Sequence, residues 1–387
     1  MPKTSVIWES FFGGSDSLGI VGLNTALALD AIGIDVGVWS WNLSQGFRRA
    51  YYSLDRPLRD FYTWGDDSER ELPDPAKALI GRLARRSIGD SGSSVSILWG
   101  GFGHVHFSEM RHTRRRIGYF FCDYSSVPEE FRDYCNGTFD VVAAPSSFVA
   151  HVFRSNGITT PIIVWNHGVD PDRFPVLHRQ ERRPFTFLFM GVAQPRKGLD
   201  ILLDAFVREF GGDPGVRLVV KSANWGRLGG YRRSFPSPNI VWHDETVPGS
   251  DLLRYFEMSD CMVVPSRGEA FCLPGLEAMA TGLPLIIHEW GGMSDYAPPE
   301  LAYHVPTSRV VPAVIPWHGW TSPPLYGEIN RDRLQATMRE VYEDPNAARI
   351  RGLQGAEHVR RDWTWNRRTE IAVERVEEIT GWQIKQE

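Results

Sequence analysis

Short apolar runs alternate with amphipathic stretches along much of the chain. Near the N-terminus, residues 5–8 and 35–39 are apolar and strand-like, and apolar positions recur at helical spacing over 20–32. Gly33 follows this stretch as a C-terminal cap, and the glycine-rich segment 11–19 precedes it. A strand, a glycine-rich turn, a helix and a second strand predict the opening of a doubly wound parallel sheet.

The same alternation continues through two series of strands with helical patterns between them. The first series continues at 95–99, 117–121, 139–146 and 162–165, and the second comprises 187–190, 217–221, 239–242, 261–264 and 285–287. The polar, proline-bearing stretch 170–184 separates them and predicts an interdomain linker. We therefore predict an α/β protein with a Rossmann-like domain over 1–170, a second over 185–364, and a C-terminal helix over 365–387.

Composition narrows the class of protein. The chain has 387 residues, which suits two or three domains, and a net charge of −5 gives no overall field that favours nucleic acid. Its 4 cysteines form no Cys-x-x-Cys pair, so we expect reduced thiols instead of disulfides or a zinc site. No apolar run is long enough for a membrane span, and no leader is recognisable at the N-terminus. These features predict a cytoplasmic protein.

Two compositional features leave alternatives open. The 14 tryptophans fit either stacking on carbohydrate or bases, or a large core. The basic runs Arg82–Arg86 and Arg111–Arg116 fit solvated, ion-paired surfaces. The alternative for these runs is contact with an anionic acceptor or the inner face of a membrane, which would make the protein peripheral there.

The most informative segment is 265–284, which places Glu269 and Glu277 eight positions apart around a short Gly/Pro loop. The apolar strand 261–264 leads into it, and a helix is predicted to begin just before the second glutamate. A strand end, a loop with free backbone N–H groups and a helix N-terminus together predict an anion site. The two carboxylates can accept hydrogen bonds from sugar or ribose hydroxyls.

A second segment, 190–199, has a glycine at a strand end and Lys197 at the start of a helix. A lysine is mildly unfavourable at a helix N-terminus unless an anion lies beside it. This placement therefore favours a lysine that neutralises a phosphate group.

Together, segments 265–284 and 190–199 resemble the signatures of the retaining GT-B glycosyltransferases of family four, also called glycosyl transferases group 1. The resemblance implies two Rossmann-like domains that face each other across a cleft, with the C-terminal helix 365–387 crossing back to the N-terminal domain. It also implies a metal-independent transferase that moves a sugar from a nucleoside-diphosphate sugar to a glycan, lipid-linked or small-molecule acceptor. No cofactor is implied, and front-side attack and double displacement both remain open.

The resemblance assigns roles to the matched residues. Glu269 would lie beside the donor sugar, Lys197 would face the leaving diphosphate, and Glu277 would hold the ribose hydroxyls. The backbone N–H groups facing sugar and diphosphate would be those of Phe271, Cys272 and Leu273. Val192 stands where the family usually has an arginine, and Arg196 is the candidate to replace it.

The first domain offers fewer candidates. Gly13 and Gly14 would approach the diphosphate from across the cleft. Many family members carry a histidine near the reacting centre; here Asp123 is our first polar candidate for a catalytic role, and His104 and His106 follow. For each histidine alone, a structural role is an equally good interpretation.

The rival hypotheses are a metal-dependent site and two other functions. Residues 170–172 spell Asp-Pro-Asp, a pattern that can hold Mn²⁺ or Mg²⁺, but no further carboxylates cluster there, so we predict no metal. A nucleotide-sugar epimerase can share the scaffold. The missing arginine and the absence of a clear histidine support a third possibility, a nucleotide-sugar-binding protein without turnover.

Overall fold

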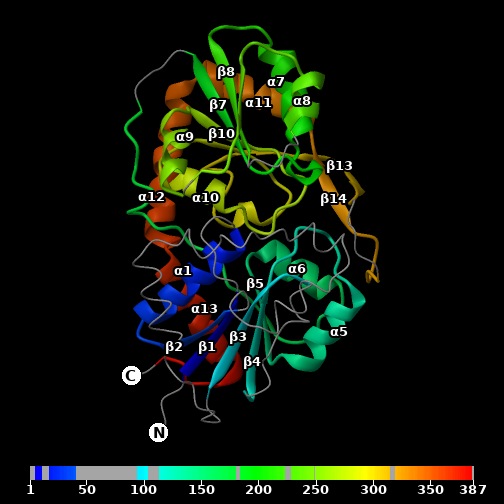
Figure 1. Cartoon of the computed structure of the whole chain (residues 1–387), viewed down its shortest axis with the longest axis vertical. Coiled ribbons are helices and arrows are strands. Elements are labelled where there is room, and N and C mark those ends of the chain that lie inside the picture. The colour runs from blue at the N-terminus through cyan, green and yellow to red at the C-terminus, as the bar shows by residue number, and fades with distance from the viewer. Residues whose placement is uncertain are drawn as a thin grey trace. The chain divides into compact units, whose positions relative to one another are not determined.

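The computed structural model describes residues 5–10, 17–40, 94–102, 113–179, 184–222, 228–247, 249–313 and 319–385. The chain divides into two compact units, each built on its own sheet (Figure 1). The first consists of Met1–His167, Val314–Pro324 and Trp365–Glu387, and the second of Gly168–Ala313 and Leu325–Thr364.

A six-stranded parallel sheet in the order β2-β1-β3-β4-β5-β6 forms the centre of the first unit. Its strands are β1 (Ser5–Ser10), β2 (Asp35–Ser40), β3 (Val95–Gly100), β4 (Arg115–Phe120), β5 (Val141–Ala144) and β6 (Ile162–Val164). Its helices include α1 (Ser17–Ala31), α5 (Glu129–Thr138), α6 (Ser147–Ser155) and α13 (Trp365–Thr380). The C-terminal α13 packs against α1, so the end of the chain completes the unit in which the chain begins.

Several tryptophans of the first unit fill its core. Trp8 and Trp165 are 0% and 1% exposed, and both rings contact Tyr119. The Tyr119 hydroxyl donates to the carbonyl of Trp165 and lies 2.9 Å from Nδ1 of His167. Burial lowers the pKa of His167 to about 3, so the imidazole stays neutral. For these residues, the core interpretation of the tryptophan excess is correct.

The second unit repeats the architecture with a parallel sheet in the order β12-β11-β10-β7-β8-β9. Its strands are β7 (Phe185–Met190), β8 (Val216–Ser222), β9 (Ile240–Asp244), β10 (Cys261–Val264), β11 (Leu285–His288) and β12 (Tyr303–Val305). Its helices are α7 (Leu199–Phe210), α8 (Leu228–Ser234), α9 (Leu253–Glu257), α10 (Leu273–Ala280), α11 (Arg331–Glu343) and α12 (Pro345–Asp362). A separate antiparallel hairpin pairs β13 (Thr307–Pro312) with β14 (Leu325–Ile329).

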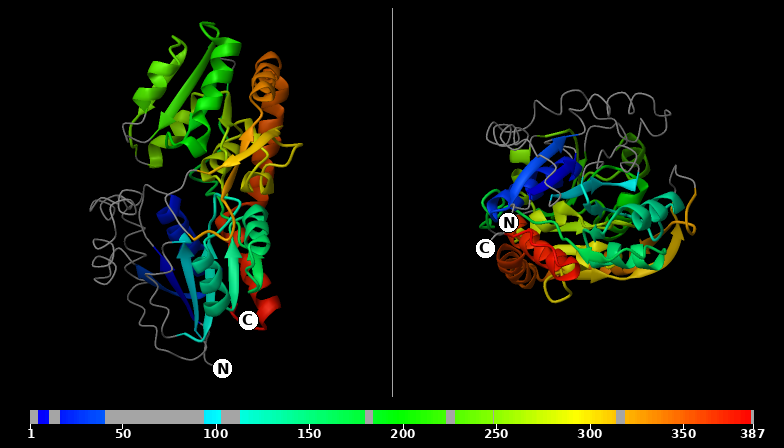
Figure 2. Two further views of the ribbon diagram at one scale, coloured as in Figure 1. Left: turned by 90° about the vertical axis from the view of Figure 1, so that its right-hand side faces the viewer. Right: turned by 90° about the horizontal axis from the view of Figure 1, so that it is seen from below.

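Strand periodicity explains how helices cover this sheet. Phe185, Phe187 and Phe189 of β7 join one apolar cluster with residues of α7 and α11, because alternate side chains of a strand point to the same face. Helices α11 and α12 are capped by Asn330 and Asp344, whose side chains accept hydrogen bonds from N–H groups of the first turn. Figure 2 shows the resulting layers of helix and sheet.

Two separate parallel sheets confirm the predicted α/β class and its two Rossmann-like halves. The facing arrangement across a cleft stays a prediction. The stretch 170–184, expected as a linker, belongs to the second unit. There Leu177 N–H donates to the carbonyl of Thr281, and the guanidinium of Arg179 donates to the same carbonyl at 2.8 Å.

Candidate functional site

The two signature segments meet at the carboxyl ends of neighbouring strands of the second sheet. Strand β10 pairs directly with β7. The short 3-10 helix η3 (Pro195–Lys197) follows β7, and the loop 265–272 follows β10. Because strand ends in an open parallel sheet meet at one edge, Lys197 and Glu269 lie together although they are 72 positions apart in sequence.

Glu269 is the centre of a small charged network. One carboxylate oxygen, Oε1, lies 2.5 Å from Nζ of Lys197 and 2.7 Å from Oγ of Ser266. The other, Oε2, lies 3.4 Å from Nη1 of Arg196. Glu269 is only 4% exposed, and burial alone would raise its pKa; Lys197, Arg196 and the donated hydrogen bonds reverse this and hold the pKa below its ordinary value. Glu269 is therefore an ionised carboxylate oriented by three donors.

The backbone around Glu269 is fixed from two directions. Gly292 N–H donates to the carbonyl of Glu269 at 2.9 Å. The preceding Gly291 has φ +122°, and a Cβ there would lie 2.8 Å from that carbonyl oxygen, so only glycine fits. On the other side, Arg267 N–H donates to the carbonyl of Arg196 at 2.7 Å, which ties the β10 loop to η3.

Helix α10 begins with an unusual backbone conformation. Cys272, at its N-cap, has φ +72°, the only positive φ of a non-glycine residue in the described part of the chain. Its carbonyl accepts a hydrogen bond of 3.1 Å from the hydroxyl of Tyr296. No described acceptor receives a hydrogen bond from the N–H groups of Cys272 and Leu273. Such a strained helix start with unpaired N–H groups is typical of an anion-binding site.

Glu277 lies one turn into α10 and is a different kind of carboxyl. It is 8% exposed, and its carboxyl makes no hydrogen bond within the described residues. Burial raises its pKa to about 7, against the opposing charge of Arg173. A buried carboxyl without a protein donor is a vacant acceptor for hydroxyl groups.

Not every predicted residue can be placed in this site. Gly13, Gly14, His104, His106 and the run Arg82–Arg86 lie outside the described residues. Asp123 belongs to the first unit, just beyond the end of β4, and its role stays a prediction. Phe271 is 2% exposed, and its ring packs against Tyr296 and Trp363, so only its backbone can serve a ligand.

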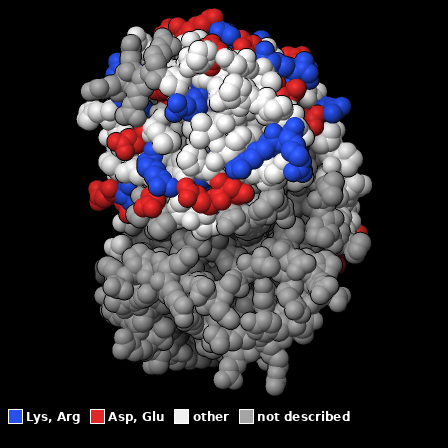
Figure 3. Space-filling model, turned by 45° about the horizontal axis from the view of Figure 1, so that its top comes forward, with Lys and Arg blue, Asp and Glu red and all other residues white. Residues whose placement is uncertain are grey.

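The second basic run is only partly described, and two of its arginines have partners. The backbone N–H of Arg116 donates to Asp140, its Nε donates to the carbonyl of Thr113, and the guanidinium of Arg115 lies over the ring of Trp382. On the face of the molecule drawn in Figure 3, positive and negative side chains are interspersed over the described residues. Contact with an anionic surface stays a prediction.

Three residues of the site were missed in sequence. Ser266 was part of the recognised signature, but the sequence did not indicate that its hydroxyl donates to the carboxylate of Glu269. Arg267 donates to Asp200 and Glu328 at 2.7 and 3.2 Å and to the carbonyl of Pro195, so it braces η3. Gly291 opens a Gly-Gly pair after β11, and that pair was the available signal.

Within the described ranges, no group of three or more His, Cys, Asp or Glu side chains could hold a metal ion. Asp170 instead caps its own turn by accepting from the N–H groups of Asp172 and Arg173. The cysteines are free, and burial raises the pKa of Cys272 to about 12. Over the same residues, no helix has the length and apolar character that a membrane crossing requires.

Gly198 offers a test of the site's construction that needs no substrate. It has φ +66°, and a Cβ there would lie 2.1 Å from the carbonyl oxygen of Pro265. We expect Gly198→Ala to displace η3 from the β10 loop and to lower the free energy of unfolding by roughly 1–3 kcal/mol or more. Gly212, also at positive φ but with open space where a Cβ would lie, is the matched control. Gly212→Ala should lower the free energy of unfolding by less. Equal losses in urea unfolding would contradict the close contact.

Comparisons with known proteins relate this chain to a family of glycosyltransferases. Residues 184–311 match the model of the family described as glycosyl transferases group 1. A D-inositol 3-phosphate glycosyltransferase from Acidothermus cellulolyticus is 26% identical over 237 residues, which are 53% of this chain and 51% of that protein. Alignments with curated relatives of this name span as little as 25% of the relative's length.

Solved structures extend the likeness to nearly the whole chain. Sucrose-phosphate synthase from Thermosynechococcus elongatus superposes with a TM-score of 0.69 at 16% identity, over 98% of this chain and all of that one. The Anabaena protein HepE, solved with UDP and glucose, gives a TM-score of 0.64 at 12% identity, over 97% of this chain and 100% of its own. At such identities the likeness shows the fold, which is GT-B. The chain is therefore a GT-B protein related to the glycosyl transferases group 1, as its two signature segments predict.

Proposed function

We propose that this protein is a retaining glycosyltransferase that transfers a sugar from a nucleoside-diphosphate sugar to an acceptor. The observation that carries the proposal is the cluster of Arg196, Lys197 and Glu269 beside the N-terminus of α10. Two cations and one carboxylate leave a net positive charge, to which the helix dipole adds. Such a site suits a diphosphate better than a neutral ligand.

The same residues suit the bond-breaking step. Negative charge grows on the diphosphate as the bond to the sugar breaks, and Lys197, with Arg196, would stabilise it. Glu269 holds both cations in place before the donor arrives, so little reorganisation is needed at the transition state. Its carboxylate would also accept hydrogen bonds from the donor sugar, while Glu277 would accept them from the ribose.

Arg196 is proposed to take over the contact that Val192 cannot make. Its guanidinium is anchored by the carbonyl of Gly268 at 2.6 Å, and 17% of its side chain remains exposed. An anchored and partly exposed guanidinium can donate to phosphate oxygens in a fixed orientation. This reduces the support that the missing arginine gives to a binding protein without turnover.

Donor binding and turnover separate the proposal from its rivals. A thermal-shift series across UDP-, GDP-, dTDP- and ADP-sugars should identify one nucleotide that raises the melting temperature, because a ligand that binds only the native state stabilises it. Release of free sugar or transfer to an acceptor from that donor supports a transferase. Binding without either supports the protein without turnover, and conversion to an epimeric sugar supports the epimerase.

Metal independence gives a further expected result. Since the proposed phosphate ligands are cationic side chains and helix N–H groups, activity should survive EDTA. The measurement is the initial rate with EDTA, with and without added Mg²⁺ or Mn²⁺. A complete loss that either metal restores would contradict the cationic-side-chain mechanism.

A further inference from the structure

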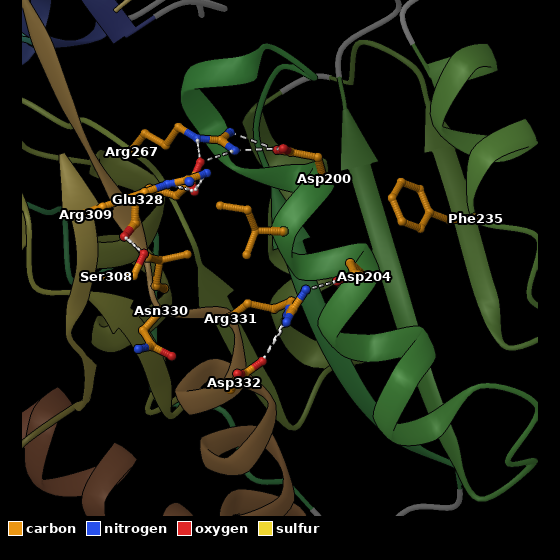
Figure 4. Close-up of a pocket in the computed structure, with 12 residues that line it drawn as sticks. Asp200, Asp204, Phe235, Arg267, Ser308, Arg309, Glu328, Asn330, Arg331 and Asp332 are labelled. Carbon is orange, nitrogen blue, oxygen red and sulfur yellow. Dashed lines mark hydrogen bonds and ion pairs between the residues drawn. The ribbon is translucent and has the colours of Figure 1, made fainter. Parts of the chain in front are cut away.

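A polar pocket of about 560 Å³ opens in the second unit, between α7, the hairpin β13–β14 and the start of α11 (Figure 4). None of the proposed donor-binding residues lines it. Its wall over 328–332 lies beyond the segment 184–311 that matches the family model. Its volume falls within the range that small-molecule sites occupy.

Ion pairs cover two sides of this pocket. On one side, Arg267 and Arg309 both pair with Glu328, at 3.2 and 2.6 Å. On the other, Arg331 lies between Asp204 and Asp332, at 3.1 and 2.9 Å. Figure 4 shows these pairs as two groups that face the same space. The lining therefore presents both hydrogen-bond donors and acceptors, and each is held in place by its ion-pair partner.

This pairing decides which ligand chemistry fits. A bare anion would have to compete with carboxylates already bound to each guanidinium, and a cation would have to displace the guanidiniums. Neutral hydroxyl groups face neither obstacle, because a hydroxyl both donates and accepts and can be inserted beside an intact ion pair. A ligand with many hydroxyls can contact several such pairs at once.

The pocket also retains unused hydrogen-bonding capacity and an apolar surface. The Arg309 side chain is 70% exposed and that of Asp332 is 78% exposed, so both keep solvent-facing polar groups after pairing. Phe235 stands apart from the ion pairs in Figure 4 and lines the same space. A pocket with an aromatic ring at one side and polar groups at the other suits a pyranose, which has an apolar C–H face and a hydroxyl rim.

We propose that this pocket binds a neutral oligosaccharide at a site distinct from the proposed donor site. The site would hold a glycan chain by its hydroxyl groups on the ion pairs, with one sugar against Phe235. It requires no turnover, so it can be tested whether or not the proposed transferase activity is found.

The test is titration of the whole protein with maltotriose, cellotriose and mannotriose, followed by saturation-transfer NMR and calorimetry. We expect at least one trisaccharide to bind at millimolar concentrations. The double variant Arg309→Ala/Asp332→Ala should weaken this binding by roughly tenfold or more, because it removes hydrogen-bonding groups without disturbing the core. The matched control is Arg375→Ala/Glu378→Ala, an exposed ion pair on α13 with side chains 59% and 62% exposed, which should bind as wild type does.

Two further measurements place the ligand. Phe235→Leu should also weaken binding, and Lys197→Ala, once circular dichroism shows that it is folded, should leave binding unchanged. The proposal is overturned if none of the three sugars binds, or if the double variant binds as tightly as its control. It is equally overturned if Lys197→Ala alone abolishes binding, which would put the sugar in the donor site, or if inorganic phosphate occupies the pocket in preference to the sugars.

Discussion

Replacing Lys197 with alanine is expected to lower kcat by roughly 10²–10³, by analogy with the loss of one oxyanion donor. The ammonium faces a diphosphate whose charge increases as the sugar leaves, so it should bind the transition state better than the ground state. Donor affinity should fall as well, by a smaller factor. The measurement is steady-state kinetics with the donor identified by thermal shift, at saturating acceptor.

The structure adds a condition to this experiment. Lys197 is the closest cation to the buried Glu269, so its removal raises the pKa of that carboxyl and destabilises the fold. Circular dichroism must therefore show that the variant is folded at the assay temperature. Lys385→Ala, which removes a lysine paired with Glu370 and Glu374 on α13, is the control for loss of a paired lysine.

The conservative variant and the neighbouring arginine sharpen the interpretation. Lys197→Arg should recover only part of the rate, because the guanidinium is bulkier and is directed differently. A kcat near wild type for folded Lys197→Ala would make Arg196 the principal phosphate ligand. Full activity of both the Lys197 and the Arg196 alanine variants would mean that the diphosphate lies elsewhere.

Replacing Glu277 should weaken binding of the bare nucleoside diphosphate and, at the same time, stabilise the free protein at high pH. Glu277→Ala removes a carboxylate that accepts ribose hydroxyls, at about 1.5–3 kcal/mol for each charged hydrogen bond. Calorimetric titration measures the loss. An unchanged dissociation constant would rule out the ribose role.

The pH dependence follows from the raised pKa. The Glu277 carboxyl has a pKa of about 7 in the folded protein and an ordinary value of 4.5 in the unfolded chain. Its contribution to the free energy of unfolding is therefore fully present at low pH and is lost as the pH rises through 7. At high pH the shift in pKa corresponds to a loss on the order of 3 kcal/mol in the free energy of unfolding. Glu277→Gln lacks this penalty, so its melting temperature should exceed that of wild type at pH 8 by more than at pH 5.

Nucleotide binding should show the opposite trend in wild type. An ionised carboxylate is the stronger acceptor, so affinity should rise between pH 6 and 8 relative to Glu277→Gln. The comparison with this variant cancels the titration of the nucleotide's own phosphate. If the two proteins show parallel pH profiles for both stability and binding, the Glu277 carboxyl does not titrate in this range.

Elements could be predicted from the sequence where hydrophobic periodicity and a motif agreed. Parallel strands buried on both faces are continuously apolar, so β7 and β10 were recognisable, and their carboxyl ends had to share an edge. The family resemblance assigned Lys197 and Glu269 to one donor site, and in the structure the two side chains lie 2.5 Å apart. Periodicity could not give the hydrogen bond from Ser266, because side-chain direction in a loop depends on φ and ψ values that it does not encode.

Other features could not be predicted because they depend on contacts distant in sequence. The brace from Arg267 to Glu328 joins residues 61 positions apart, and the hairpin β13–β14 carries no motif that would predict this contact. The positive φ of Cys272 was equally hidden, since a cysteine gives no conformational signal of the kind that glycine gives at Gly198. The low pKa of His167 arises from burial among aromatic rings of several strands, which no single segment reveals.

The discontinuous first unit has a consequence for how the protein matures. Its sheet is synthesised first, yet Val314–Pro324 is made only after Gly168–Ala313 of the second unit, and Trp365–Glu387 only after the whole of that unit. Until α13 arrives, the surface of α1 that it covers stays open to water or to other chains. The second unit, by contrast, lacks no segment once Thr364 has been added. The half that carries the proposed donor site can therefore acquire its native structure before the half that precedes it in the sequence.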